Sequence, residues 1–157
     1  MADWIEELDK FFKTQKERNE SLMPIADEFL TTVVGGAFTE LKQGLEKLRK
    51  RAWSSYSVGG HFITVSDSLG AEEIFYGIVA QVTGGGITVM QFQRFTSKRD
   101  GAQIDDRSIL IQPTSSMTVS EIEAEIKGIT KESIMRRFLE LYKEAIGYTT
   151  FKGPKLG

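Results

Sequence analysis

The sequence predicts one α+β domain: two N-terminal helices, a five-stranded, mainly antiparallel curved sheet, and a C-terminal helix packed on the sheet. Three observations predict it. Apolar residues recur at helical spacing from residue 3 to 52, residues 53–112 are rich in Val, Ile, Phe, Tyr and Thr with glycines between them, and helix-start signals return after residue 117. Because 157 residues is the length of one ordinary domain, we expect a single domain over residues 1–147.

The first helix is predicted over residues 3–20. Trp4, Leu8, Phe11 and Phe12 follow the i, i+4, i+7, i+8 spacing that places apolar side chains on one helix face. Proline lacks a backbone N–H and disfavours a helical residue before it. We therefore expect Pro24 to end this helix.

A second helix is predicted from residue 25 to 51, with apolar residues at near-heptad spacing. Its weak part is residues 31–36, where β-branched residues precede Gly35 and Gly36 and lower the helix propensity. A kink there, or a helix that begins only at Ala37, are both compatible with this pattern.

The middle of the chain is predicted to form the sheet. Candidate strands cover residues 53–58, 61–66, 73–82, 87–95 and 107–112. Gly59-Gly60 and Gly84-Gly85 are typical of two-residue hairpin turns. The second turn sets a register in which Val82 pairs with Ile87, Ala80 with Val89, Ile78 with Gln91, Val79 with Met90, Gly77 with Phe92, and Tyr76 with Gln93. Both faces are then apolar, so we expect the long helix on one and another helix or a second subunit on the other.

Residues 96–106 are predicted to be a polar loop, and the chain then returns to helix. Thr118 and Glu121 match a capping box, and Thr130 is a second N-cap candidate before a helix that ends at Gly147. We expect a poorly ordered tail over 148–157. In element order alone the chain loosely resembles cystatin-like and helix-grip folds, a resemblance that implies room for a cavity between helix and sheet but no activity.

Composition disfavours several function classes. Lys and Arg total 20 and Asp and Glu total 22, for a net charge of −2, with no cysteine and one histidine. No thiolate metal site or disulfide is possible, and no signal peptide or membrane span is evident. We expect a soluble, cytoplasmic protein without metal or cofactor, and an enzymatic activity is disfavoured.

Polar residues on an apolar sheet face form the candidate ligand pocket. Its residues are Tyr76, Ile78, Gln91, Gln93 and His61. Polar groups on such a face can orient a small ligand, but a solvated sheet edge or a dimer rim fits the same pattern. His61 lacks an evident catalytic partner and is also compatible with an ordinary strand residue beside a turn.

A basic segment with neighbouring aromatic residues is the candidate phosphate or nucleic-acid site. Its residues are Lys47, Arg49, Lys50, Arg51 and Trp53, with Tyr56 close by. Cations beside aromatic rings can track a phosphate backbone and stack bases. Cations at a helix C-terminus also stabilise its dipole, and the net charge disfavours nucleic acid.

Three functions follow. The leading expectation is a non-enzymatic interaction module, a homodimer that uses an apolar sheet face or the Trp4–Phe12 stripe. The alternatives are a small-ligand carrier or pocket enzyme with a cavity between helix and sheet, and a weak nucleic-acid binder through residues 47–56. The partners to consider are thus a second copy, another protein or a small molecule, and no membrane is expected.

Overall fold

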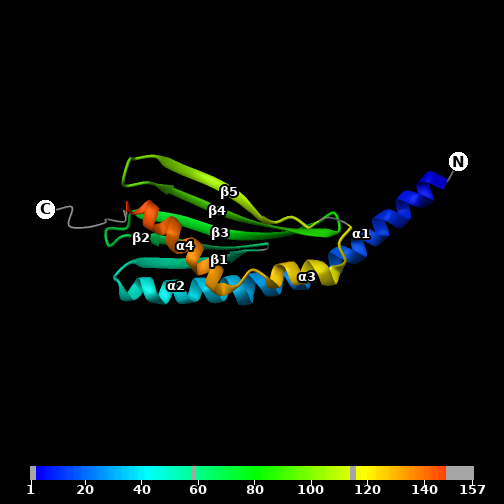
Figure 1. Ribbon diagram of the computed structural model, residues 1–157, viewed down its shortest axis with the longest axis horizontal. Coiled ribbons are helices and arrows are strands. Elements are labelled where there is room, and N and C mark those ends of the chain that lie inside the picture. The colour runs from blue at the N-terminus through cyan, green and yellow to red at the C-terminus, as the bar shows by residue number, and fades with distance from the viewer. Residues whose placement is uncertain (1–2, 58, 114–115, 148–157) are drawn as a thin grey trace.

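The computed structural model describes residues 3–57, 59–113 and 116–147. In chain order the elements are α1 (Asp3–Glu28), the π-helix η1 (Phe29–Val34), α2 (Gly35–Lys47), β1 (Arg51–Ser57), β2 (Gly60–Ser66), β3 (Glu72–Thr83), β4 (Gly86–Thr96), β5 (Gln103–Ile111), α3 (Val119–Lys127) and α4 (Lys131–Ala145). The strands form one antiparallel meander in the order β1-β2-β3-β4-β5. This confirms the predicted α+β class, with a curved sheet and helices before and after it (Figure 1).

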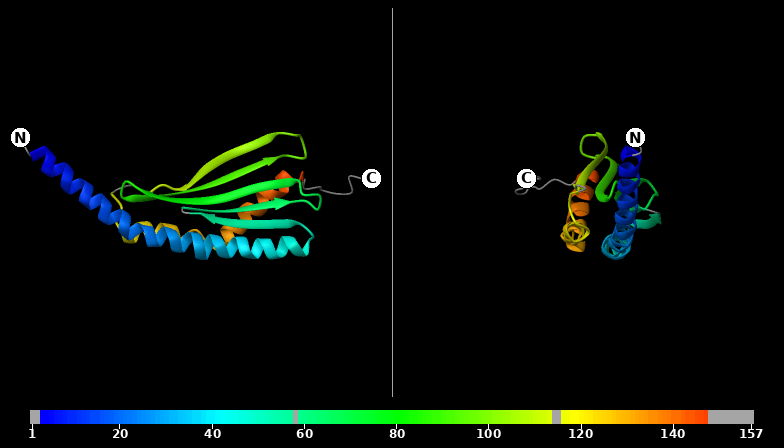
Figure 2. Two further views of the ribbon diagram at one scale, coloured as in Figure 1. Left: turned by 180° about the vertical axis from the view of Figure 1, so that it is seen from behind. Right: turned by 90° about the vertical axis from the view of Figure 1, so that its right-hand side faces the viewer.

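The helices pack on one face of the sheet. Phe38 of α2 and Phe138 of α4 both contact the ring of Tyr76, with centroid separations of 6.0 and 5.6 Å. One side chain of β3 therefore lies between the long helix and α4. Seen from behind, strands β3 to β5 have no helix in front of them (Figure 2). The expectation that another helix covers the second face is wrong for the described part of the chain, because α4 shares the inner face with the long helix.

The long N-terminal helix is continuous from α1 through η1 to α2. The predicted break at Pro24 is wrong, since Pro24 lies inside α1. A proline inside a helix costs roughly 3 kcal/mol through its lost hydrogen bond and ring clash. Leu22 and Ala26 on either side of it are buried in the core, and burial of this face offsets the local cost.

The weak stretch of this helix is where the π-helix forms. η1 covers residues 29–34 and buries Phe29, Leu30 and Val34, and α-helical geometry resumes at Gly35. The wider turn absorbs the unfavourable β-branched run without ending the helix. The helix does not start at Ala37, because it is already continuous through η1. It ends at Lys47 and not at residue 51.

The hairpin between β3 and β4 has the predicted register. Val82 pairs with Ile87, Ile78 with Gln91 and Tyr76 with Gln93, the last two being pairs within the candidate pocket. Gly84 and Gly85 have φ angles of 63° and 80°, the left-handed conformation that a tight hairpin turn needs and that glycine adopts at little cost.

Other details of the sheet differ from the prediction: β1 begins at Arg51, and Gly60, predicted as a turn residue, belongs to β2 and pairs with Ser57. β5 begins at Gln103 and pairs with β4 through Asp105 and Asp106, so the polar loop is shorter than 96–106. Charged residues are tolerated there because β5 is an edge strand. Gly77 does pair with Phe92, but the ring that lies over it is Phe62, whose Cδ1 would be 2.1 Å from an added Cβ.

Both C-terminal helices begin with a complete capping box. Thr118 and Glu121 exchange hydrogen bonds at the start of α3, and Thr130 and Ser133 do so at the start of α4. This confirms Thr118 and Thr130 as the two N-caps. The predicted tail, 148–157, lies outside the described residues.

Candidate self-association surface

The first part of α1 extends beyond the sheet. We call residues 3–17 the N-terminal arm, and Figures 1 and 2 show it reaching away from the body of the molecule. Arg18 and Asn19, which follow the arm directly, hydrogen-bond to the body of the molecule. The Arg18 side chain donates hydrogen bonds to the carbonyls of Gly85 (3.0 Å) and Met117 (2.6 Å), and the amide of Gly85 donates to Asn19 (2.9 Å).

The arm carries a stripe of exposed apolar side chains. The exposed fractions are 60% for Trp4, 54% for Ile5, 44% for Leu8, 53% for Phe11 and 59% for Phe12. Leu8 lies two heptads before the fully buried Leu22, and Phe11 one heptad before Arg18. Residues a whole number of heptads apart share nearly the same side of a helix. The stripe therefore continues, past the end of the sheet, the face with which this helix contacts its own domain.

Water contact at this stripe is unfavourable. Burying a large apolar side chain contributes about 1.5–3 kcal/mol, and a helix of about 15 residues is marginal in water without tertiary contacts. Because none of the described elements covers Trp4, Phe11 or Phe12, the arm has the composition of a packed helix without a packing partner.

Charge is segregated along the arm. Residues 3–9 contain four acidic side chains and no basic one, whereas residues 10–16 contain three lysines and no acidic one. Asp9 and Lys13 form an ion pair of 3.0 Å across the boundary, with both side chains exposed. An exposed i,i+4 pair contributes only a few tenths of a kcal/mol, so most of this charge is available to a partner.

A second apolar surface covers the back of the sheet. We call it the outer sheet face, and its apolar residues are Trp53, Phe62, Phe75, Val79, Met90, Phe92 and Ile109. Trp53 and Ile109 are the most exposed of them, at 50% and 55%. Phe62 stacks on Phe75 with 5.4 Å between centroids, and the Arg94 guanidinium lies 4.5 Å above the Phe75 ring. Partial mutual cover makes this face less exposed than the arm.

The candidate ligand-pocket residues lie together on the inner face. Tyr76 and Ile78 are fully buried and Gln91 nearly so. The Tyr76 hydroxyl donates to Gln91 Oε1 at 2.9 Å, and burial raises the pKa of Tyr76 well above its ordinary value. In this arrangement Tyr76 and Gln91 satisfy each other inside the core.

Gln93 and His61 lie at the margins of that core. Gln93 Oε1 is buried without a hydrogen-bond partner. His61 Nδ1 is 3.2 Å from the Leu30 carbonyl in η1, and the ring meets Phe38 edge-on at 5.3 Å. Two hollows open nearby. One is lined by Tyr76, Leu110, Ile129, Ser133 and Arg137, and the other by Thr39, Glu40, Ser54, His61 and Lys131 among others.

The structure separates the residues of the basic segment. Lys47 ends α2, and Arg49 occupies the left-handed region, with φ of 65°, in the connection to β1. Trp53 and Tyr56 are three residues apart on a strand and so point to opposite faces. Lys50 forms an ion pair with Glu73. Weak nucleic-acid binding through residues 47–56 stays a prediction.

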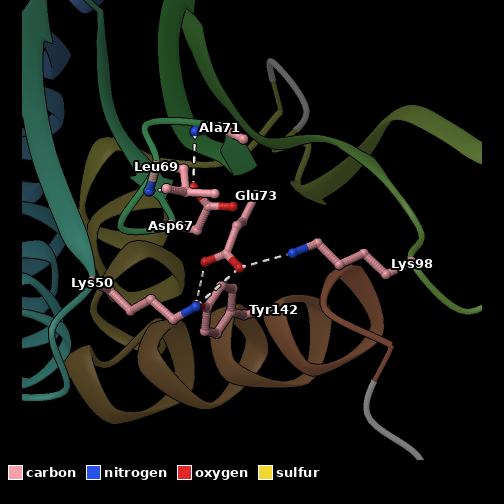
Figure 3. Close-up of polar contacts among 7 residues, drawn as sticks. All are labelled: Lys50, Asp67, Leu69, Ala71, Glu73, Lys98 and Tyr142. Carbon is pink, nitrogen blue, oxygen red and sulfur yellow. Dashed lines mark hydrogen bonds and ion pairs between the residues drawn. The ribbon is translucent and has the colours of Figure 1, made fainter.

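Glu73 organises a polar cluster that the sequence did not indicate (Figure 3). Its carboxylate accepts hydrogen bonds from Lys50 at 3.0 Å, Lys98 at 3.3 Å and the Tyr142 hydroxyl at 2.7 Å. The side chain is only 2% exposed. Burial alone would raise the pKa of Glu73, but these three donors outweigh it and hold the pKa below its ordinary value.

A β-bulge places Glu73 there. Val65 pairs with Ile74 and Ser66 with Glu72, which leaves Glu73 as the extra residue of β3. A bulge redirects a side chain that regular alternation would send elsewhere. The only signal in the sequence was two glutamates before an apolar strand, which is also typical of a solvated strand end.

Metal chemistry has no candidate in the described ranges, where no group of three or more His, Cys, Asp or Glu side chains is arranged to hold an ion. Within residues 3–57, 59–113 and 116–147, none of the helices has the length and apolar character needed to cross a membrane. Comparison of the chain with protein-family models, curated proteins and solved structures finds no significant match. The functional argument therefore comes from the surfaces themselves.

Proposed function

We propose that this protein is a non-enzymatic interaction module that forms a homodimer through its N-terminal arm. The observation that carries the proposal is the apolar stripe of Trp4, Leu8, Phe11 and Phe12, exposed on a helix that extends past its own sheet. Exposed apolar surfaces of this kind mark protein interfaces. The outer sheet face is the second candidate interface on the same molecule.

A second copy is the partner that the arm itself favours. Its two halves carry opposite charge, so the surface is complementary to itself. Twofold symmetric dimers use one such self-complementary patch on both subunits, and they are the commonest oligomers.

Light scattering on matched variants separates the two surfaces. Phe11→Gln with Phe12→Gln removes half-exposed side chains of the arm, and Trp53→Gln with Ile109→Gln does the same on the outer sheet face. Neither pair takes fully buried residues from the core, so both proteins should fold. We expect the parent and the sheet variant to have twice the 17.6 kDa chain mass at tens of micromolar, and the arm variant to be a monomer.

Each other outcome has a definite meaning. A parent chain that is monomeric throughout this range contradicts self-association. Loss of the dimer in the sheet variant alone would retain self-association but move the interface to the outer sheet face.

A small-ligand carrier is the second proposal, and the hollow beside Tyr76 favours it. Gln93 pairs with Tyr76 across the sheet, and Tyr76 lines the hollow that also contains Ser133 and Arg137. A hollow with a few convergent polar groups can orient a ligand. Arg137 would suit a carboxylate or another small anion.

Native mass spectrometry of the purified protein tests this second proposal. A copurified small anion that is lost in Arg137→Gln supports it. A bare chain mass, together with no thermal shift from a panel of small carboxylates, contradicts it.

A further inference from the structure

We propose that two arms pair antiparallel, so that residues 3–9 of one chain lie against residues 10–16 of the other. This geometry deepens the proposed function and rests on the self-association stated there. The partner of each arm is therefore the N-terminal arm of a second copy.

Charge selects the direction. Parallel arms would place the four acids of one chain against the four acids of the other, and lysines against lysines. Antiparallel arms place acids against lysines at both ends of the contact. Opposed like charges at the flanks of paired helices are unfavourable, and this is how charged flanking residues set helix orientation.

Leu8 and Phe11 of the apolar stripe flank the boundary between the acidic and basic halves. The stripe runs from Trp4 to Phe12, and the boundary between the acidic and basic halves lies between Asp9 and Lys10. A twofold axis near this boundary places Leu8 and Phe11 of one arm close to Phe11 and Leu8 of the other. Burying the aromatic residues of both arms brings the buried area to the order of 1,000 Å², about the lower limit for a specific interface.

The antiparallel geometry also explains why the assembly stops at two chains. In an antiparallel pair each arm covers the other, and no apolar stripe is left to recruit a third chain. An arm on the outer sheet face of a neighbour would instead be a head-to-tail contact, which would leave a free arm at one end and a free sheet face at the other.

Directional cross-linking tests the geometry, because the parent chain has no cysteine. Glu7 and Thr14 are both exposed and lie one heptad apart, so they share one side of the arm. In an antiparallel pair with the axis between Asp9 and Lys10, position 14 of one chain lies opposite position 5 of the other. Position 7 is two residues further along the same helix, about 3 Å away in helix rise and within reach of a short cross-linker. In a parallel pair, position 7 lies level with position 7 and not with position 14.

The experiment uses Glu7→Cys and Thr14→Cys as full-length single variants, treated with a short bismaleimide alone and as an equal mixture at the same total concentration. Light scattering first checks that both variants have the parent's mass. We expect the mixture to cross-link at least fivefold more than either variant alone.

Each result has one meaning. Equal cross-linking of a single variant and the mixture overturns the antiparallel geometry and leaves self-association intact, since it indicates parallel arms. A dimeric mass without cross-linking in any sample overturns the antiparallel contact of the arms. A monomeric mass overturns both proposals, and protection of the arm on vesicles of anionic phospholipid would then assign it to a membrane surface.

Discussion

Tyr76 and Gln91 determine whether the inner face is a packed core or a binding site. Their hydrogen bond of 2.9 Å is buried, and the Tyr76 ring contacts the rings of Phe38 and Phe138. In a packed core, Tyr76→Phe leaves Gln91 without its donor and lowers the free energy of unfolding by about 1–2 kcal/mol.

Tyr76→Phe with Gln91→Met should recover most of that loss, since removing both polar groups removes the unsatisfied one. Urea denaturation of the parent, the two single variants and the double variant measures the coupling. Purely additive losses would show that the two side chains do not act as a pair.

Glu73 predicts a specific dependence of stability on pH. Glu73→Gln should lower the free energy of unfolding at pH 7 by about 1–3 kcal/mol, because a carboxylate with three donors becomes a weaker acceptor. Lys98→Met is the matched control and should cost under about 1 kcal/mol, since Lys98 is half exposed.

The sign of the pH effect follows from the lowered pKa. A carboxyl group whose pKa is lower in the folded state stabilises the fold above its unfolded pKa, about 4.3, and loses that contribution as the pH falls through the folded value. The advantage of the parent over Glu73→Gln should therefore be constant near pH 7 and shrink below about pH 4. Urea midpoints at pH 7, 5 and 3 measure it, and a gap that widens on acidification would contradict the assignment.

At the scale of elements, the long helix depends on its glycines to different extents. An added Cβ at Gly35 would be 3.3 Å from His61 Cε1 and 3.4 Å from the Leu30 carbonyl, whereas at Gly44 nothing lies within 4 Å. Both residues are in α2. Alanine gains about 0.5–1 kcal/mol over glycine in a helix where there is room for it.

We therefore expect Gly44→Ala to raise the melting temperature and Gly35→Ala to leave it unchanged or lower it. Thermal unfolding, monitored by circular dichroism, compares the melting temperatures of the two variants with that of the parent. Equal stabilisation by both substitutions would mean that η1 and His61 move to make room for the added methyl group at Gly35. That result would contradict the close packing around Gly35.

Comparison of the predicted and observed elements shows which features a short segment of sequence can determine. Gly84 and Gly85 define a turn of known length, and the register of β3 and β4 follows from it residue by residue. Pro24 is a local signal that was misleading. The free energy that a proline costs inside the helix is offset by burial of neighbouring residues against a sheet that follows later in the chain. The bulge at Glu73 depends on the pairing of β2 with β3, and no short segment contains that information.

For the whole molecule, the arrangement of layers determines which surfaces remain free. The sequence predicted two apolar sheet faces and an apolar first helix, and all three are present. It did not predict that the long helix and α4 would share the inner face, which leaves the outer sheet face and the N-terminal arm uncovered by described elements (Figure 2). The stripe of the arm was identified from its spacing, whereas its position beyond the sheet depends on where the sheet ends.

Amide hydrogen exchange at two protein concentrations tests self-association through the arm most directly. Peptides covering residues 3–17 should exchange within seconds at low micromolar concentration and become at least tenfold slower at a few hundred micromolar, while peptides from β3 and β4 stay unchanged. Exchange in the arm that is equally fast at both concentrations would contradict the central claim.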